Sequence, residues 1–504
     1  MFASRVTRVV RTSKLVGSAP RSHPVHLTAT SRRTWLATSA AAAIGAAAWR
    51  PLWANSPPDV MVLGAGLAGL HAATLLEQVG LRVRVLEAAQ RVGGRVHTLD
   101  DLPGRPETGG TQIGAAYTRL MVATKRLALP LQASGRSPLL RDEGMVLFIQ
   151  GQRYTRAEWA ASARNPLPPS VRALAPDRAL GRLVGASPLN KLTDWRDPAQ
   201  AALDMPLESE LRARGVSDAA LRLMEANNPY GHTLAQTSLL NMHYVHSSVA
   251  QIMKTPGPVL NVAGGNQRLP EAMAKALRGE VLLGRRAIEV DAGPHGVTVR
   301  CADGSLHRAR HAVCTLPLPA MRQVRFSPQL PSLHREAVQM LAYAHVTQLH
   351  LEVLRPFWES ADGAGLLPYL WSDGPLERMF PRDDLGQGRA ETLTVWINGA
   401  GCAPWDAMDD AQAARSVADE LAGVYPASRG AVRLARRVSW QKQPLAGGAW
   451  ANWAPGQISR YARHLAAPLG RMHFAGEHTG GGLRGMEAAM ESGERAAAEI
   501  VARR

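Results

Sequence analysis

The chain has 504 residues, and its 58 Lys and Arg outnumber its 41 Asp and Glu, which gives a formal net charge of +17. A hydrophobic content of 46% and a charged content of 20% are ordinary for a folded protein of two or three domains. They exclude a disordered chain, a collagen-like chain and a small disulfide-dense protein. Cys301, Cys314 and Cys402 form no close pair, so neither a zinc site nor a CxxC redox motif is predicted.

Residues 1–54 contain eight Lys and Arg and no acidic residue, so the rest of the chain carries a net charge of +9. Within this segment Ser31-Arg32-Arg33-Thr34-Trp35-Leu36 precedes a weakly hydrophobic, alanine-rich stretch, which resembles a twin-arginine export signal. We therefore expect residues 1–54 to be an export leader and the mature protein to be periplasmic or secreted. The alternative is a chance arginine pair in a disordered leader.

The remaining positive charge contains no Lys- and Arg-rich run interleaved with aromatic residues, so it predicts a generally basic surface and no nucleic-acid partner. No run of about 18 strongly apolar residues follows the leader, so no stable membrane span is predicted.

A glycine-rich turn follows directly on the leader. The apolar run 60–63 predicts a buried parallel strand, Gly64-Ala65-Gly66-Leu67-Ala68-Gly69 comes next, and a helix (70–79) and a second strand (81–86) follow. Gly64 permits the tight turn, Gly66 lets a diphosphate approach the backbone, and Gly69 lets helix and strand pack closely. Glu87 lies 18 positions after the last glycine and can accept hydrogen bonds from ribose hydroxyls. The pattern predicts a dinucleotide site that includes Ala68 at the helix start.

Two further glycine motifs narrow the choice of dinucleotide. Arg91-Val92-Gly93-Gly94-Arg95 offers backbone donors and a guanidinium to phosphate oxygens, and Glu107-Thr108-Gly109-Gly110-Thr111-Gln112 follows it. This combination resembles the flavin-containing amine oxidase family, in which an RxGGR run and an E/D-x-GG run both line FAD. The resemblance implies FAD rather than NAD, with contacts from Arg95, Gly110, Thr111 and Gln112.

The C-terminal segment strengthens the resemblance. The runs 472–479 and 485–497 closely match the family signature FAGE…GxMEGAxxSGxRAA. Gly476 and Glu477 follow a short strand, and Glu477 can hold a hydroxyl of the ribityl chain. A helix that starts near Gly485 and Met486 directs its N-H groups and its dipole at the ring, where they stabilise negative charge on the reduced flavin.

The middle of the chain gives weaker signals. Residues 118–255 contain amphipathic helical stretches such as 206–214 and 218–227, and a helix over 271–277 precedes strands at 281–284 and 297–300 that flank a turn. A buried strand is expected at 312–317. In the family, the residue at the position of Val281 contacts the adenine through its backbone. Further expected elements are helices at 331–341 and 411–424 and strands at 346–354 and 392–398.

The resemblance implies an α/β fold of amine-oxidase type. A doubly wound, Rossmann-like FAD-binding domain is assembled from residues 55–130, 258–330 and 465–504. A mixed-sheet substrate domain with a helical insertion comprises residues 131–257 and 331–464.

The substrate side is predicted from two tryptophans ten residues apart. In the family, a Trp at the position of Trp440 lies by the flavin, and an aromatic residue at the position of Trp450 forms one wall of the substrate slot. Monoamine oxidases place a Tyr at the opposing wall, where this chain has Gly485, so a two-aromatic cage is not established. They have a flavin-linking Cys where this chain has Ala449, which implies noncovalently bound FAD.

Many family members place a Lys, through a water, near the reactive flavin nitrogen, and Gln348 occupies that position here. No Lys lies between Lys275 and Lys442, so a shifted alignment does not supply one. Gln348 can hold the water but brings no charge, which leaves open whether the protein reacts quickly with oxygen. His232, His243 and His246 allow a metal site by their spacing, but no acidic partner completes the ligand set, and we favour a structural role.

We predict an enzyme that oxidises a primary or secondary amine, or an L-amino acid, to an imine by hydride transfer to FAD. Water then hydrolyses the imine, and the electrons pass to oxygen or another acceptor. The alternative is a flavin-dependent desaturase or isomerase acting on an apolar C–C bond. A protein that binds FAD without catalysis is the third reading, and self-association to a homodimer is left open.

Overall fold

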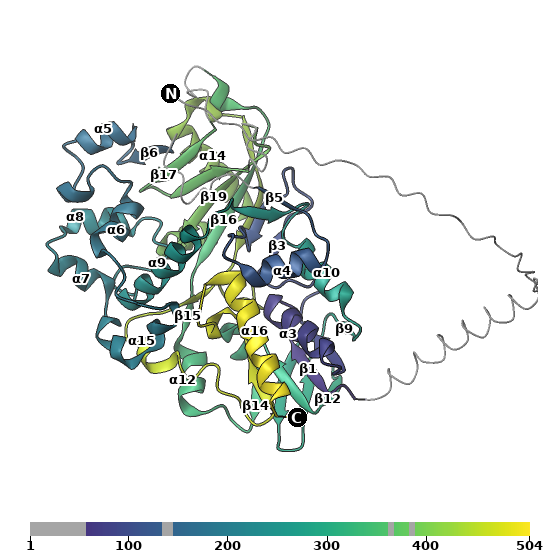
Figure 1. The fold of residues 1–504 in the computed structure, drawn as a ribbon. Helices are drawn as coiled ribbons and strands as arrows, with labels where there is room; N and C mark the ends of the chain where they lie inside the picture. Colours follow the sequence, from purple (N-terminus) through teal and green to yellow (C-terminus); the bar gives the residue numbers. More distant parts are fainter. Residues whose placement is uncertain (1–56, 134–144, 361–366, 383–388, 504) are drawn as a thin grey trace, which may run out of the picture. The chain divides into compact units, whose positions relative to one another are not determined.

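The computed structural model of the chain describes residues 57–133, 145–360, 367–382 and 389–503, which Figure 1 shows as a coloured ribbon. The predicted export leader lies outside these residues. Contacts between Cα atoms group residues 57–504 into one unit. No helix in the described ranges is long and apolar enough to cross a membrane.

A five-stranded, entirely parallel sheet forms the predicted nucleotide-binding core. Its order is β22 (Met472–Phe474), β13 (His311–Cys314), β1 (Val60–Leu63), β2 (Val83–Leu86) and β9 (Val281–Leu282). The central strand β1 is buried along its whole length, as expected for a strand covered on both faces. The strands come from three separated stretches of the chain, so the sheet cannot form until distant segments meet.

Helices cover this sheet. α3 (Leu67–Gln78) packs along α16 (Gly485–Val501), and the two lie side by side at the centre of Figure 1. Gly493 permits this contact, because a Cβ there would lie 2.3 Å from the carbonyl oxygen of Ala68. α4 (Thr118–Arg126) and α10 (Arg268–Ala276) pack against α16 and α3 respectively.

A second sheet corrects one prediction. Its order is β12 (Leu306–Ala309), β11 (Val297–Cys301), β10 (Ala287–Ala292) and β14 (Arg325–Ser327). The strands predicted at 281–284 and 297–300 do not flank a turn, because β9 pairs with β2 and β10 pairs with β11. The strand β10 was missed because Glu289 and Asp291 interrupt its apolar pattern where one face is exposed.

The largest sheet has seven strands. Their order is β20 (Val432–Ser439), β16 (Val346–Val353), β19 (Thr392–Asn398), β18 (Arg378–Pro381), β17 (Tyr369–Ser372), β6 (Met145–Ile149) and β7 (Gln152–Tyr154). All neighbours are antiparallel except β17 and β6. The strands predicted at 346–354 and 392–398 are confirmed as the paired β16 and β19. Two-stranded pairs complete the sheets: β3 (His97–Thr98) with β4 (Glu107–Gly109), β5 (Leu131–Ala133) with β8 (Leu260–Val262), and β15 (Ala342–Tyr343) with β21 (Ala451–Asn452).

A helical segment lies beside the seven-stranded sheet in Figure 1. It contains α5 (Arg156–Ala161), α6 (Pro176–Val184), α7 (Leu207–Ala213), α8 (Asp218–Glu225) and α9 (Leu239–Lys254). The helices predicted at 206–214 and 218–227 are confirmed as α7 and α8, those at 331–341 and 411–424 as α12 (Ser332–Met340) and α14 (Asp410–Val424). The short helices α11 (Leu318–Met321), α13 (Cys402–Ala407) and α15 (Gln457–Tyr461) were not predicted.

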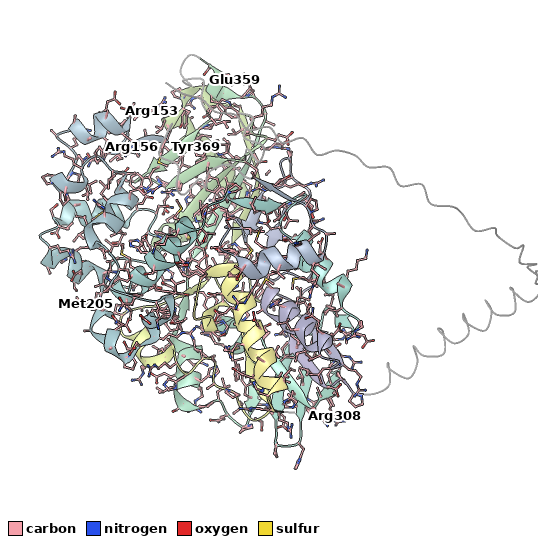
Figure 2. The ribbon with its side chains drawn as sticks, viewed as in Figure 1. Arg153, Arg156, Met205, Arg308, Glu359 and Tyr369 are labelled. Carbon is pink, nitrogen blue, oxygen red and sulfur yellow. The ribbon has the colours of Figure 1, made fainter. Side chains whose placement is uncertain are left out.

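Exposed arginines occur on two different sheets of the protein. Arg153 on β7 and Arg308 on β12 are both exposed, and Figure 2 places them far from one another.

Candidate active site

A cavity of about 560 Å³ lies between the five-stranded sheet and the seven-stranded sheet. This volume is in the range of cofactor and ligand sites. All the glycine motifs singled out in the sequence reach it. The predicted site residues that line it are Gly64, Gly66, Ala68, Glu87, Arg95, Gly110, Thr111, Gln112, Trp440, Trp450, Gly476, Glu477, Gly485 and Met486.

The three glycines of the turn at 64–69 differ in what a Cβ atom would meet at each position. Gly64 has a φ of +104°, and a Cβ there would lie 2.6 Å from the hydroxyl oxygen of Thr315. A Cβ on Gly69 would lie 2.0 Å from the carbonyl oxygen of Gly64, so Gly69 packs against the turn and does not line the cavity. A Cβ on Gly66 would meet no protein atom within 4 Å. Gly66 is therefore the position where a ligand can approach the backbone.

Glu87 lies at the end of β2 and lines the cavity. Its carboxylate accepts hydrogen bonds from the backbone N-H groups of Ala65 (2.7 Å) and Ala89 (2.8 Å). Burial raises the pKa of Glu87, and these N-H groups oppose that shift. The carboxylate is thus fixed at the glycine turn, where a ribose would lie beside the diphosphate.

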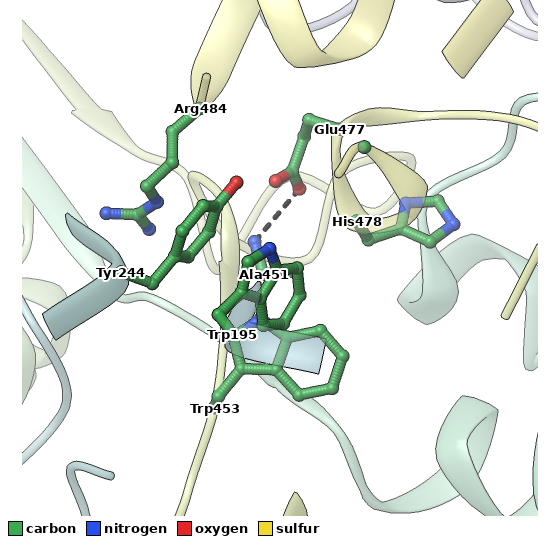
Figure 3. A pocket seen from close by; sticks show the side chains of 8 residues that line it. Trp195, Tyr244, Ala451, Trp453, Glu477, His478 and Arg484 are labelled. Carbon is green, nitrogen blue, oxygen red and sulfur yellow. Dashed lines mark hydrogen bonds between the residues drawn. The ribbon is translucent and has the colours of Figure 1, made fainter. Parts of the chain in front are cut away.

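Arg95 and Glu477 join three parts of the chain at the cavity. The Arg95 guanidinium donates to the Glu477 carboxylate at 2.9 Å and to the backbone oxygen of Ala449 at 3.0 Å. Glu477 also accepts from the N-H of Ala451 at 2.9 Å, the bond drawn in Figure 3. Burial alone would raise the pKa of Glu477, but the charge of Arg95, the nearby His478 and the hydrogen bonds from Arg95 and Ala451 together outweigh it, so the pKa is lowered and the carboxylate stays charged.

Trp440 is held in a fixed orientation. Its indole N-H donates to the backbone oxygen of Thr108 at 2.8 Å, and a Cβ on Gly109 would lie 2.9 Å from its ring. Trp450 also lines the cavity, as does Trp396 on β19, which sequence analysis did not identify. The substrate side is therefore broad and aromatic.

Tyr117 is a second lining residue that sequence analysis missed. Its hydroxyl lies 3.9 Å from the place where a Cβ on Gly485 would be. An aromatic ring from the start of α4 thus lies next to the position where monoamine oxidases carry their second aromatic wall. No local motif marks Tyr117, because only the contact between α4 and α16 brings it there.

Gln348 is not part of the cavity lining. It is fully buried on β16, where its carbonyl oxygen lies 3.2 Å from Nε2 of His350, and its own Nε2 has no hydrogen-bond partner. Val346, two residues earlier on the same face of the strand, and Trp396, its neighbour on β19, both line the cavity. Gln348 therefore lies on the same face of the sheet as Val346 and Trp396, and its predicted contact with a water at the flavin stays a prediction.

Val281 also lies outside the lining. It is on β9 at the free edge of the five-stranded sheet. The carbonyl groups of Glu280 and Leu282 accept from β2, so by alternation the backbone groups of Val281 point away from β2. This orientation leaves them available to a ligand, but the adenine contact itself stays a prediction.

The three histidines are separate from the cavity. His246 pairs with the hydroxyl of Tyr230 at 2.9 Å, and His232 packs edge-on against His345. Within the described ranges no group of three or more His, Cys, Asp or Glu side chains could hold a metal ion. The structural role favoured for His246 agrees with its contact.

A buried carboxylate supports the wall that carries Trp396. Glu377 accepts from the side chain of Asn227 (2.9 Å) and from the N-H of Asn398 (2.8 Å), and Asn227 also donates to the carbonyl oxygen of Trp396 (3.0 Å). Burial raises the pKa of Glu377 from 4.5 to about 7 and outweighs these hydrogen bonds, which lower it.

We expect this carboxylate to make stability depend on pH. Because the folded pKa is the higher one, the unfolded chain releases its proton first, and the free energy of unfolding falls as pH rises from about 4.5 to about 7. The loss is on the order of 3 kcal/mol. Urea unfolding at pH 5 and pH 8 should show this decrease in the wild type and a much smaller one in Glu377→Gln. Glu359→Gln, at an exposed site (Figure 2), is the control and should behave as wild type.

The parallel sheet, the glycine turn at the carboxyl end of its central strand and the aromatic slot are typical of a nucleotide-dependent oxidoreductase. A family profile described as flavin containing amine oxidoreductase matches residues 67–501. The chain belongs to this family, so FAD is its cofactor and its reaction is the oxidation of an amine.

The relatives agree with this assignment. The chain is similar to an L-amino acid dehydrogenase of Synechocystis, with 24% identity over 89% of this chain and 95% of that protein. It is similar to the flavin-containing amine oxidase B of Mus musculus, with 24% identity over 89% of this chain and 86% of that protein. Among solved structures, cyclohexylamine oxidase from Brevibacterium oxydans has a TM-score of 0.73 at 24% identity, over 89% of this chain and 99% of that one, and shares the fold. The predicted α/β fold is confirmed.

The residues present fit FAD. Gly66 leaves open space for a diphosphate, Glu87 is fixed where a ribose would lie, and Arg95 and Glu477 lie together where the ribityl chain would run. When bound, FAD supplies the two-electron acceptor for amine oxidation. The α16 N-terminus at Gly485 and Met486 would favour negative charge on the reduced ring.

We expect FAD to be bound noncovalently for two reasons. Ala449 lines the cavity at the position where monoamine oxidases have the linking Cys, and the three cysteines of the chain are free and buried outside the lining. Acid precipitation of the purified protein should therefore leave all the flavin in the supernatant. A yellow pellet after washing would show a covalent bond that this structure does not explain.

Proposed function

We propose that the enzyme binds its amine in the neutral form and passes the electrons mainly to an acceptor other than oxygen. The observation that carries the first part is the composition of the cavity lining, in which the described residues include no His, Lys or Asp. Its two carboxylates, Glu87 and Glu477, are already bound by backbone N-H groups and, for Glu477, by Arg95. No lining side chain is therefore available to take a proton from an ammonium group.

The residues of the slot position the amine and exclude water. Trp396, Trp440 and Trp450, with Val346 and the loop at 443–446, provide an apolar enclosure beside the expected flavin position. Orientation in a dry site accounts for rate enhancement without a dedicated base. The charge of Arg95 is neutralised by Glu477, so it does not repel an amine.

A pH profile tests this reading. Because the amine must lose its proton to water before it binds, kcat/KM for flavin reduction should rise about tenfold per pH unit up to the amine's own pKa. A less basic amine of similar shape should shift the rising limb to lower pH by the difference between the two amine pKa values. A limb that stays at the same pH for both amines would instead assign it to an enzyme group.

The second part rests on Gln348, which is buried and uncharged where many family members have Lys. After anaerobic reduction of the flavin by an amine panel, reoxidation by an artificial acceptor should be much faster than reoxidation by air. Rapid reoxidation in air would make the enzyme an oxidase. Failure of every amine to bleach the flavin would contradict the proposed choice of substrate.

Export is the third part of the proposal, and the twin-arginine pattern at Arg32 and Arg33 supports it. The FAD-loaded enzyme should be recovered from the periplasm or the medium of a bacterial host. Replacement of both arginines by lysine should keep it in the cytoplasm. Equal export of the two forms would rule out this route.

A further inference from the structure

Trp396, which lines the cavity, is held by hydrogen bonds at its ring and at its backbone. The indole N-H donates to the side-chain oxygen of Asn398 at 2.9 Å, and the backbone oxygen accepts from the side chain of Asn227 at 3.0 Å. The ring packs in the same cluster as Trp440 and Trp450, the other two tryptophans of the slot. The width of the slot at this wall therefore depends on the two asparagines.

One buried carboxylate binds both asparagines. Oε2 of Glu377 accepts from the side chain of Asn227 at 2.9 Å and from the backbone N-H of Asn398 at 2.8 Å. Asn227 follows helix α8, Glu377 lies in the turn between β17 and β18, and Asn398 ends β19. Three segments that are far apart in the sequence thus meet at this carboxylate, next to a residue of the cavity lining. We call Glu377, Asn227, Asn398 and Trp396 the Glu377 network.

Gly401 provides the space for the carboxylate. A Cβ at this position would lie 1.8 Å from Oε1 of Glu377, which is far too close for two atoms that are not bonded. The φ of Gly401 is −62°, which every type of residue adopts, so its backbone conformation does not require glycine. Room for the Glu377 carboxylate is therefore the reason for a glycine at position 401.

The backbone of the Glu377 network has an uncommon conformation at two places. Glu377 has a φ of +44° and Asn227 has a φ of +56°, and they are two of the five non-glycine residues with positive φ in the described ranges. The turn imposes this conformation on Glu377, because its N-H donates to Gly374 and its carbonyl oxygen accepts from the N-H of Ser372. Strained residues of this kind cluster at functional sites.

We propose that Glu377 is a positioning residue for the substrate slot. Through Asn227 and Asn398 its carboxylate fixes the ring of Trp396, and the fixed ring limits the width of the amines that the slot accepts. A hydrophobic pocket distinguishes ligands by size only if its walls hold their positions. Loss of the carboxylate should therefore admit wider ligands while FAD binding is unchanged. The inference rests on the proposed amine oxidation for its substrates, but the slot can be tested with ligands that do not react.

The first test measures binding without reaction. Benzamide and the wider 2-naphthamide are titrated against the oxidised, FAD-loaded enzyme, and the change in flavin absorbance gives Kd for each. The wild type should bind benzamide about tenfold more tightly, and both Trp396→Leu and Glu377→Leu should reduce this preference to less than about threefold. A wild type that binds both amides equally, or a Glu377→Leu protein that keeps the full preference, would overturn the proposal.

Two further variants change the carboxylate in different ways. Glu377→Gln keeps an acceptor oxygen for Asn227 and Asn398, so it should restore the preference for benzamide that Glu377→Leu loses. Gly401→Ala displaces the carboxylate without removing it and should lower the preference as Glu377→Leu does. Gly423→Ala is its matched control, because a Cβ there would meet nothing within 4 Å, and it should behave as wild type. Equal preferences in the two alanine variants would contradict the positioning role.

A pair of asparagine variants separates positioning from support of the fold. Asn398→Ala removes the acceptor of the indole N-H and should lower the preference for benzamide. Its control is Asn165→Ala, because Asn165 is similarly buried and donates to the backbone oxygens of Trp159 (3.0 Å) and Arg172 (2.9 Å) in the helical segment. Both variants should have a lower Tm, but only Asn398→Ala should change the preference. A change in both, or weaker FAD binding in Asn398→Ala, would show that the network only supports the fold.

Turnover distinguishes this inference from the proposed function. Anaerobic flavin reduction is measured with benzylamine and with 2-naphthylmethylamine. Glu377→Leu should change the ratio of their KM values as it changes the ratio of the amide Kd values, and should alter the maximal rate for benzylamine less than about threefold. If neither amine reduces the flavin while the amide ratios respond as expected, the positioning role stands and the proposed reaction fails. A lower maximal rate with unchanged amide ratios would contradict the positioning role.

Discussion

Gly69→Ala is expected to abolish FAD binding and to destabilise the fold. A Cβ at this position would lie 2.0 Å from the carbonyl oxygen of Gly64 and 3.0 Å from the side chain of Val62. Both neighbours belong to β1 and its turn, which are paired on both sides, so neither can move away. Forcing α3 away from β1 should cost at least 1–3 kcal/mol of unfolding free energy, as overpacking in cores does, and displace the diphosphate site. Purified protein should be colourless, with a lowered Tm.

Gly66→Ala separates cofactor binding from folding. Gly66 has an ordinary φ of −76°, and its Cβ would meet no protein atom, so the apo-protein should be as stable as wild type. The added methyl would occupy the space into which the diphosphate must come. Titration with FAD should show an affinity reduced about 100-fold, which corresponds to a loss of about 2.7 kcal/mol of binding free energy.

Gly423→Ala is the matched control for both glycine variants. Gly423 lies in α14, and its Cβ would also meet nothing within 4 Å. Alanine in a helix is favoured over glycine, so stability should rise by about 0.5–1 kcal/mol while FAD binding is unchanged. A Gly69→Ala protein that retained flavin as tightly as this control would contradict the role assigned to the turn.

The sequence predicts well those parts of the fold in which one short segment contains the residues that determine its local structure. In the turn at 64–69, Gly69 is needed for contacts with Gly64 and Val62, which lie within a few residues, so strand, turn and helix could be placed in advance. The run at 485–497 was placed by its match to the family signature, although Gly493 meets Ala68 on α3, which is far away in the sequence. Together with the runs at 91–95, 107–112 and 476–477, these motifs located the part of the cavity lining that the glycine turns form.

The remaining features depend on contacts between segments that are far apart in the sequence. Tyr117 and Trp396 reach the cavity only because α4 and β19 are brought there by long-range packing. The strand β10 has a mixed polar pattern that becomes stable through pairing with β11 and β14.

The pair formed by Arg95 and Glu477 should contribute more as a pair than either residue does alone. Their side chains are 23% and 14% exposed to the open cavity, so each charge depends on the other. Glu477→Ala leaves the guanidinium with the backbone oxygen of Ala449 and the ring of Tyr343 but no carboxylate, and should cost about 3 kcal/mol of unfolding free energy. FAD binding should weaken as well, because the same carboxylate faces the ribityl position.

The double variant Arg95→Met with Glu477→Ala distinguishes a coupled pair from two independent contacts. Methionine fills part of the space without leaving an unpaired charge, so the double variant should be more stable than Glu477→Ala alone. Urea unfolding of the wild type, both single variants and the double variant gives a coupling free energy, which we expect to be on the order of 2 kcal/mol. Additive losses would mean that the two side chains act separately, and that their contact at 2.9 Å only accompanies the folding of the cavity.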